Sequence, residues 1–252
     1  MKVIIEGSLV NFDETEIDER GWLTGDGIFE TIKTVNGLVW ALSRHMRRAL
    51  KSSINLGLNL PSEELVRRSL QLLLKQEIHS RGFIRLSFAT CGKWAAVHLP
   101  YLEISSPAKL LTYPHHLVVA KTPIKSFPYA HRLEILAAAK KLGFDETIVT
   151  SSTAKVCEGA VTNLLLKIEG QWVTPPISDG VLPGIVRALV IENCRVAVRS
   201  VAVWEISKIE SAFLLSSLRI AQPVAAIDGR ELAQSLDFKL EIEAMALRTS
   251  VD

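Results

Sequence analysis

The run KSFPYAHRLEILAAAKKLGFDE, Lys125–Glu146, governs how the rest of this 252-residue sequence is interpreted. It follows a β-rich segment, residues 116–122, and its apolar side chains recur at the spacing of one helix face, with these three expected inward: Leu133, Leu136 and Ala137. Gly143 is typical of a residue that ends a helix. Lys125 thus lies at a predicted strand-to-helix junction, where a partly desolvated amine can form a Schiff base. Because most lysines are solvated surface groups, position alone does not make it catalytic.

Further motifs lie on both sides of this run. They are the GDGIFE of Gly25–Glu30, Asp145-Glu146, Glu158-Gly159, Asn163, the TPP of Thr174–Pro176 and the LPGIVR of Leu182–Arg187. In this order they resemble the class IV pyridoxal-phosphate enzymes, which include branched-chain aminotransferases, D-amino-acid aminotransferases and 4-amino-4-deoxychorismate lyases. The resemblance covers nearly the whole chain. It implies an α/β (α+β) fold of type IV: a smaller N-terminal α/β domain, a larger C-terminal domain with a mixed, barrel-like sheet, and pyridoxal 5'-phosphate at their junction.

The resemblance also assigns roles to single residues. Lys125 would hold the cofactor and act as base and then acid, and Glu158 would keep the ring nitrogen protonated. Arg48, in the H-x-x-R of His45–Arg48, would bind the phosphate, for which a permanently charged guanidinium is suited. The amides of Ile185 and Val186 would join it, because the first amides of a helix bind phosphate. Relatives often have threonine at the second of these two positions.

Three further assignments are less direct. Tyr129 would hydrogen-bond the phenolic oxygen of the cofactor. Ser217 would donate to the phosphate, or it is a plain turn residue. Arg85 would bind a substrate carboxylate, or it pairs structurally. We expect Asp145 and Glu146, by contrast, to be the solvated end of a helix–strand turn.

Two motifs look most like aminodeoxychorismate lyases of the actinobacterial type: KS-x-x-Y-A at Lys125–Ala130 and SSLR at Ser216–Arg219. They imply a lyase of folate biosynthesis that converts 4-amino-4-deoxychorismate to 4-aminobenzoate and pyruvate. The nearest alternative is an aminotransferase for branched-chain or D-amino acids. The second is a non-catalytic α/β binding protein. The family resemblance further implies a homodimer and a small-molecule substrate.

Composition limits the remaining possibilities. With 48% hydrophobic residues the chain can form two domains, which we place at 1–110 and 111–252, with a linker at Ser105–Pro114. A net charge of +2 gives no reason to expect nucleic acid or membrane as a partner, and no apolar run approaches the roughly 18 residues that span a bilayer. The three cysteines lack metal-site spacing, so we expect no metal, small buried thiols and a cytoplasmic location: Cys91, Cys157 and Cys194.

The hydrophobic pattern predicts alternating strands and helices elsewhere. Asn36-Gly37 indicates a hairpin, because both residues accept a positive φ. A helix is expected over residues 43–57 with Met46, Leu50 and Ile54 on its inner face, and further helices over 62–79, 185–193, 204–209 and 238–248. Strands are expected over residues 2–6, 83–90, 95–105, 146–152, 156–167, 196–201, 212–216 and 223–227.

Overall fold

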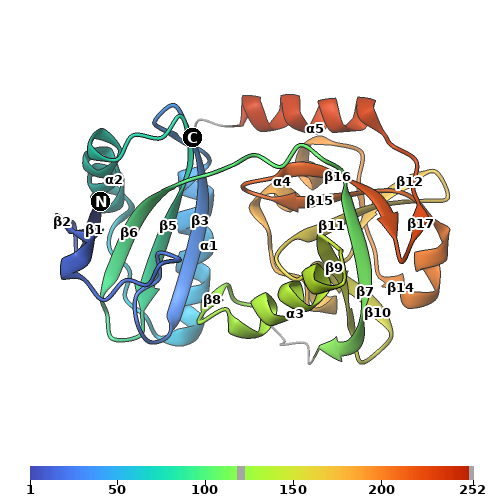
Figure 1. Cartoon of the computed structure of the whole chain (residues 1–252), viewed down its shortest axis with the longest axis horizontal. Helices are drawn as coiled ribbons and strands as arrows, with labels where there is room; N and C mark the ends of the chain where they lie inside the picture. The colour runs from blue at the N-terminus through green and yellow to red at the C-terminus, as the bar shows by residue number, and fades with distance from the viewer. Residues whose placement is uncertain (118–122, 250–252) are drawn as a thin grey trace. The chain divides into compact units, whose positions relative to one another are not determined.

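The computed structural model describes residues 1–117 and 123–249, and it divides into two compact units (Figure 1). The first contains Met1–Glu103, Ile124–Pro128 and Thr249, and the second contains the other described residues between Ile104 and Arg248. The first unit thus continues to Glu103 and includes Lys125. The domain boundary near residue 110 stays a prediction.

The first unit contains an antiparallel sheet in the order β2-β1-β6-β5-β3-β4, and β8 pairs with β3. The strands are β1 Lys2–Ile5, β2 Ser8–Asn11, β3 Gly27–Val35, β4 Leu38–Val39, β5 Arg81–Ala89, β6 Trp94–Pro100 and β8 Ser126–Phe127. Two helices pack on one face of this sheet, α1 (Leu42–Leu56) and α2 (Glu63–Gln76), and bury an apolar core with it. The predicted hairpin is confirmed as the β3–β4 turn.

The second unit is built on a mixed, curled sheet in the order β13-β12-β11-β15-β16-β7-β9-β10-β14, with β17 paired to β16. Its strands are β7 Ala108–Leu117, β9 Glu146–Ser151, β10 Lys155–Glu158, β11 Asn163–Ile168, β12 Gln171–Thr174, β13 Ala197–Val198, β14 Val201–Ala202, β15 Ile209–Ser216, β16 Ile220–Ile227 and β17 Arg230–Glu231. Strand β7 runs parallel to both of its neighbours, β9 and β16. The helices are α3 Ala130–Lys141, α4 Ile185–Asn193 and α5 Leu236–Arg248. The expected mixed, barrel-like sheet is confirmed.

Two helix faces differ from the prediction. In α1, Leu50 and Ile54 are exposed, and the buried face instead includes His45 and Ser53. In α3, the buried residues are Ile135 and Ala139 instead of the three predicted ones. In α1, polar side chains with hydrogen-bonding partners occupy inner positions, which an apolar pattern does not detect. In α3, apolar residues fill nearly every position from Leu133 to Ala139, so their spacing does not single out one face.

The predictions for one linker and one strand also need correction. The expected linker at Ser105–Pro114 contains the start of β7, where Ala108 and Leu110 are buried in the core. The expected strand over residues 156–167 is two strands, β10 and β11, separated by the turn Gly159–Thr162. This turn positions residues of the candidate site.

Candidate functional site

In the first unit, a carboxylate, an imidazole and a guanidinium are buried together between β3 and α1. Glu30 is 2% exposed, and its Oε1 accepts from Nε of Arg48 at 2.8 Å. Its Oε2 accepts from Nη2 of Arg48 and lies 2.7 Å from Nδ1 of His45. Because Glu30 shares the helix-facing side of β3 with Ile28 and Ile32, its charge needs these partners to be tolerated. The predicted phosphate ligand Arg48 is thus held on two sides by one carboxylate.

The protonation states of this cluster follow from its burial and charges. Burial alone would raise the pKa of Glu30, but the charge of Arg48 and the hydrogen bonds from His45 and Arg48 outweigh it and hold the pKa at about 2. Burial lowers the pKa of His45 below its usual value of 6.5. Since an ionised carboxylate can only accept, the proton of the neutral imidazole lies on Nδ1. His45 is therefore a packing and hydrogen-bonding residue.

Lys125 lies beside the same strand. Its carbonyl accepts from the amide of Phe29 at 2.9 Å, and its Nζ is 4.4 Å from the centroid of the Phe29 ring. The pairing of β8 with β3 fixes this position, and a Cβ on Gly27 would lie 2.1 Å from the carbonyl oxygen of Phe88. The charge of the Lys125 amine contributes to the low pKa of His45. The first unit thus brings Lys125 close to the cluster that holds Arg48.

Arg85 projects from β5 among aromatic rings. Its guanidinium carbon is 5.0 Å from the ring centroids of both Trp22 and Phe29, and its Nε donates to the carbonyl of Arg20 at 3.2 Å. These contacts support the structural role. Two buried polar atoms in this part of the first unit have no hydrogen-bond partner among the described residues: Nε1 of Trp22 and Oγ of Ser87. Ser87 lies two residues after Arg85 on the same strand. The substrate-binding role of Arg85 stays a prediction.

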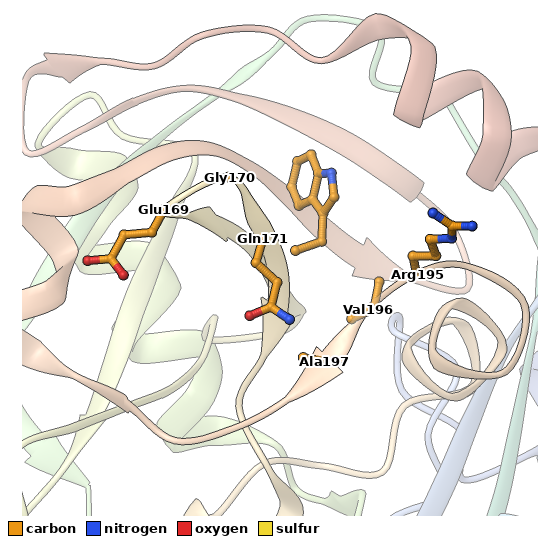
Figure 2. A pocket seen from close by; sticks show the side chains of 7 residues that line it. Glu169, Gly170, Gln171, Arg195, Val196 and Ala197 are labelled. Atoms are coloured by element: carbon orange, nitrogen blue, oxygen red, sulfur yellow. The ribbon is translucent and has the colours of Figure 1, made fainter.

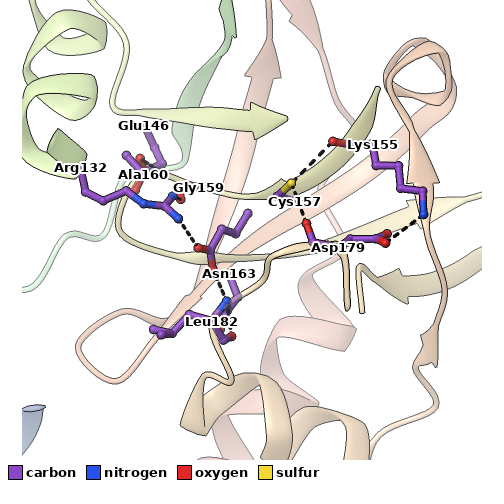
Figure 3. Close-up of polar contacts among 10 residues, drawn as sticks. Arg132, Glu146, Lys155, Cys157, Gly159, Ala160, Asn163, Asp179 and Leu182 are labelled. Carbon is purple, nitrogen blue, oxygen red and sulfur yellow. Dashed lines mark hydrogen bonds and ion pairs between the residues drawn. The ribbon is translucent and has the colours of Figure 1, made fainter. Parts of the chain in front are cut away.

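In the second unit, Glu158 lies at the end of β10 and is 4% exposed. Figure 3 labels three residues that hydrogen-bond to it: Arg132, Asn163 and Leu182. Its Oε1 accepts from Nη2 of Arg132 at 2.8 Å. Its Oε2 accepts from Nδ2 of Asn163 and from the amide of Leu182, both at 3.0 Å. A carboxylate with donors on both oxygens is held in one orientation. The contact of Glu158 with a ring nitrogen stays a prediction.

The start of α4 is tied to this carboxylate. Nδ2 of Asn163 donates both to Glu158 and to the carbonyl of Leu182 at 3.0 Å. A Cβ on Gly184 would lie 1.8 Å from Oδ1 of Asn163, so only glycine fits before the helix. No side chain in the described part of the chain caps α4 at this end. Ile185, the first residue of α4, and the following Val186 have buried side chains, so only their amides are suited to the predicted phosphate role.

The remaining predicted residues lie at turns of the second unit. Ser217 is half-buried in the β15–β16 turn, where Oγ of Ser216 accepts from the amide of Arg219 at 3.2 Å. The next residue, Ile220, has a φ of 55°, a conformation that β-branched residues rarely adopt. Tyr129 is half-buried and precedes α3. The roles assigned to Ser217 and Tyr129 stay predictions.

One expectation about the second unit is wrong. Glu146 is 0% exposed, although the sequence suggested a solvated turn. Its Oε1 accepts from the amides of Thr147 at 3.1 Å and Ala160 at 2.9 Å, and Oε2 accepts from the hydroxyl of Thr162 at 3.3 Å. Asp145 is exposed, as the sequence predicted, and it accepts from the amide of Lys109 at 2.8 Å. Both carboxylates thus accept from backbone amides, but only Glu146 is withdrawn from water.

Other features carry no predicted site residue. A surface hollow of about 700 Å³ is lined by seven residues at the β12–β13 edge of the second unit: Glu169, Gly170, Gln171, Trp172, Arg195, Val196 and Ala197 (Figure 2). Within residues 1–117 and 123–249, no cluster of three or more metal-binding side chains occurs, and no helix is long and apolar enough to cross a membrane. The side chains of His115 and His116 lie outside the described set.

The cysteines differ from one another. Cys91 is exposed, which corrects the expectation of a buried thiol, whereas Cys157 is buried and Cys194 half-buried. Burial raises the pKa of both Cys157 and Cys194 to about 11, so neither is a thiolate at neutral pH.

Sequence reasoning missed three residues that hold the candidate site: Glu30, Arg132 and Glu146. A signal was present for Glu30, because a carboxylate that alternates with Ile28 and Ile32 must be buried with a partner. No local signal identifies Arg132, since its contact with Glu158 spans 26 positions of sequence.

Comparison with curated proteins gives consistent relatives. The chain is 25% identical to a putative branched-chain-amino-acid aminotransferase of Methanocaldococcus jannaschii, with 91% of this chain and 89% of the relative covered. It is 26% identical to a D-alanine aminotransferase of Bacillus licheniformis, with 92% and 90% covered. A bifunctional aminodeoxychorismate lyase / D-amino acid transaminase of Mycobacterium tuberculosis is 22% identical, with 86% and 87% covered.

Solved structures share the fold. A branched-chain aminotransferase of Thermoproteus uzoniensis superposes with a TM-score of 0.87 at 23% identity, covering 99% of this chain and 95% of the other. A putative 4-amino-4-deoxychorismate lyase of Legionella pneumophila gives 0.81 at 21% identity, covering 88% and 91%. The family model of class IV aminotransferases matches residues 27–227. The chain therefore belongs to the class IV aminotransferase family.

Proposed function

We propose that this protein is a pyridoxal-phosphate-dependent lyase that converts 4-amino-4-deoxychorismate to 4-aminobenzoate and pyruvate. The supporting observation is the pair of lyase-like motifs, Lys125–Ala130 and Ser216–Arg219, which contain three residues to which the resemblance assigns roles: Lys125, Tyr129 and Ser217. The relatives with lyase activity in their names agree with this choice. A cytoplasmic homodimer is part of the proposal.

The residues present fit pyridoxal 5'-phosphate. The group needs an amine, a carboxylate for its ring nitrogen and cationic or amide donors for its phosphate. Glu158 is desolvated and oriented by three donors, and Gly184 leaves no side chain at the start of α4. In the first unit, Arg48 is fixed by Glu30 and lies in the same cluster that the amine of Lys125 influences.

Each residue then has a stated task. By the resemblance, the phosphate would be bound by Arg48, by the amides of Ile185 and Val186, and by Ser217. Tyr129 donates to the phenolic oxygen. When bound, the cofactor accepts the electron pair that is left when a carbon next to nitrogen loses its proton.

Lys125 would remove the proton from the substrate carbon that carries the amino nitrogen, and it would return a proton later in the reaction. The carbon–oxygen bond to the enolpyruvyl group breaks as the ring becomes aromatic, and the enolpyruvate takes up a proton to give pyruvate. One substrate thus yields two products, and no oxidant is consumed. Arg85 pairs with a substrate carboxylate in this scheme.

The second candidate is an aminotransferase for branched-chain or D-amino acids, which the relatives from M. jannaschii and B. licheniformis favour. One experiment separates the two. Purified protein with pyridoxal phosphate is mixed with aminodeoxychorismate, and 4-aminobenzoate is measured. The lyase gives 4-aminobenzoate in many turnovers, whereas rapid, complete conversion of the cofactor to its amine form by amino acids, without 4-aminobenzoate, would refute the proposal.

A parallel experiment tests the cofactor residue. Borohydride reduction followed by peptide mass spectrometry should locate the cofactor on Lys125, and Lys125→Ala should lose both the label and the visible absorption band. A binding protein without catalysis would show no product and no band. A label on another lysine would refute the assignment.

A further inference from the structure

Two buried donor groups of the first unit have no partner among the described residues: the indole Nε1 of Trp22 and the hydroxyl of Ser87. Trp22 is 6% exposed and Ser87 is 0% exposed. A buried polar group without a hydrogen-bond partner destabilises a folded protein, so native structures contain few of them. Two such donors close together indicate that a ligand or a water molecule is bound between them.

Both donors lie beside the ring of Phe29. On the neighbouring strands β3 and β5, Phe29 is the direct partner of Ser87, so their side chains are adjacent on one face of the sheet (Figure 1). The ring centroid of Trp22 is 5.1 Å from that of Phe29. The backbone before Trp22 packs on the same face, since a Cβ on Gly21 would lie 3.1 Å from Cβ of Arg85. The two donors therefore share one aromatic neighbour and one side of the sheet.

A positive charge accompanies the donors. The guanidinium carbon of Arg85 is 5.0 Å from the ring centroids of both Trp22 and Phe29. Arg85 and Ser87 are two positions apart on β5, so their side chains are on the same face, and Nη1 of Arg85 donates to the neutral Oγ1 of Thr31. A cation beside an N–H donor and an O–H donor is suited to a negatively charged acceptor, and a carboxylate can accept from several donors at once.

The same ring brings the donors near Lys125. Its Nζ is 4.4 Å from the centroid of Phe29, and its carbonyl accepts from the amide of that residue. Phe29 is thus the common neighbour of the two donors, of Arg85 and of the amine that the proposed function uses. A carboxylic acid bound by Trp22 and Ser87 would lie close to this amine.

We propose that Trp22 and Ser87 bind one carboxylate of the substrate. Nε1 of Trp22 and Oγ of Ser87 donate to its oxygens, Arg85 supplies the opposite charge, and the rings of Trp22 and Phe29 contact the apolar part of the molecule. The site therefore takes a planar or ring-bearing carboxylic acid. The choice of acid rests on the proposed function, whereas the site itself rests on the two unsatisfied donors.

The test uses variants that remove one donor each. Ser87→Ala removes the hydroxyl and adds no volume, and Trp22→Phe removes the N–H but keeps an aromatic ring. The matched control is Ser69→Ala, because Ser69 is another buried serine of the first unit, and its Oγ already donates to the carbonyl of Leu65 at 2.8 Å.

Calorimetric titration of the full chain, with and without pyridoxal phosphate, measures binding of 4-aminobenzoate and of its neutral amide. The wild type should bind the acid at least tenfold more tightly than the amide. Ser87→Ala and Trp22→Phe should each weaken binding of the acid about tenfold, and the control should leave it unchanged. Without ligand, the melting temperature of Ser87→Ala should equal or exceed that of the wild type, because no hydrogen bond is lost.

Equal affinity for the acid in wild type and Ser87→Ala would overturn the proposal, as would equal affinity of the wild type for acid and amide. A lower melting temperature of Ser87→Ala with unchanged affinity would show that a buried water satisfies the hydroxyl, and would also overturn it. If Trp22→Phe does not fold, Ser87→Ala decides. If the protein binds no pyridoxal phosphate or forms no 4-aminobenzoate, the proposed function fails, while the titrations without cofactor still decide whether this site binds carboxylates.

Discussion

The buried ion pair between Glu30 and Arg48 leads to a prediction about acid stability. The pKa of Glu30 falls from 4.5 to about 2 on folding. Each pKa unit is equivalent to about 1.4 kcal/mol, so ionised Glu30 stabilises the folded first unit by about 3 kcal/mol at neutral pH. Because the folded pKa is the lower one, this stability is present above pH 4.5 and is lost as the pH falls towards 2. At pH 3, about 2 kcal/mol of this stabilisation of the folded first unit is lost.

Glu30→Gln should remove this dependence. The variant leaves the guanidinium of Arg48 buried without its counter-ion, so we expect it to be less stable by about 3–5 kcal/mol at pH 7. The difference in free energy of unfolding between wild type and variant should shrink by about 2 kcal/mol between pH 7 and pH 3, since protonated Glu30 resembles glutamine. Urea unfolding followed by tryptophan fluorescence measures it, because Trp22, Trp40 and Trp94 lie in the first unit.

The control is Glu205→Gln, in the second unit. Burial and charge in the first unit are unaffected by it, so the low-pH loss assigned to Glu30 should persist. The difference in free energy of unfolding between wild type and Glu30→Gln could instead stay constant from pH 7 to pH 3. That result would show that Arg48 does not keep the carboxyl group of Glu30 ionised, and the account of the cluster would be wrong.

Further predictions concern the second unit, the strand β5 and the thiols. Arg132→Ala should weaken cofactor binding about tenfold through loss of its charged hydrogen bond to Glu158, and Arg132→Lys should restore it in part; unchanged dissociation constants would contradict this role. Arg85→Gln should raise the KM for aminodeoxychorismate more than tenfold if Arg85 binds a carboxylate, whereas a fall in melting temperature alone would indicate structural pairing. A thiol reagent at pH 8 should label Cys91 alone in the native protein, because burial raises the pKa of the other two thiols.

The sequence was sufficient for the order of elements because local signals agree there. The hairpin turn, the capping serine of α2 and the LPG entry to α4 each determine the local backbone. These signals also placed the motifs that define the family.

The polar interior could not be predicted in the same way. His45 and Ser53 in α1 occupy buried positions that an apolar pattern assigns elsewhere, and Glu146 is buried because its partners come from a turn thirteen and more residues later. Such contacts depend on tertiary pairing, which one sequence without spatial information does not contain. The same limit applies to Arg132.

The segment Ile124–Pro128 belongs with the first unit, although the chain on either side of it belongs with the second. A chimera that exchanged only residues 1–103 between two relatives would therefore take Arg48 from one parent and Lys125 from the other. It would also leave β8 paired with a foreign β3. The two units are therefore not exchangeable at a single boundary. A chimera that keeps Lys125 and Arg48 from the same parent must exchange residues 1–103 and 124–128 together.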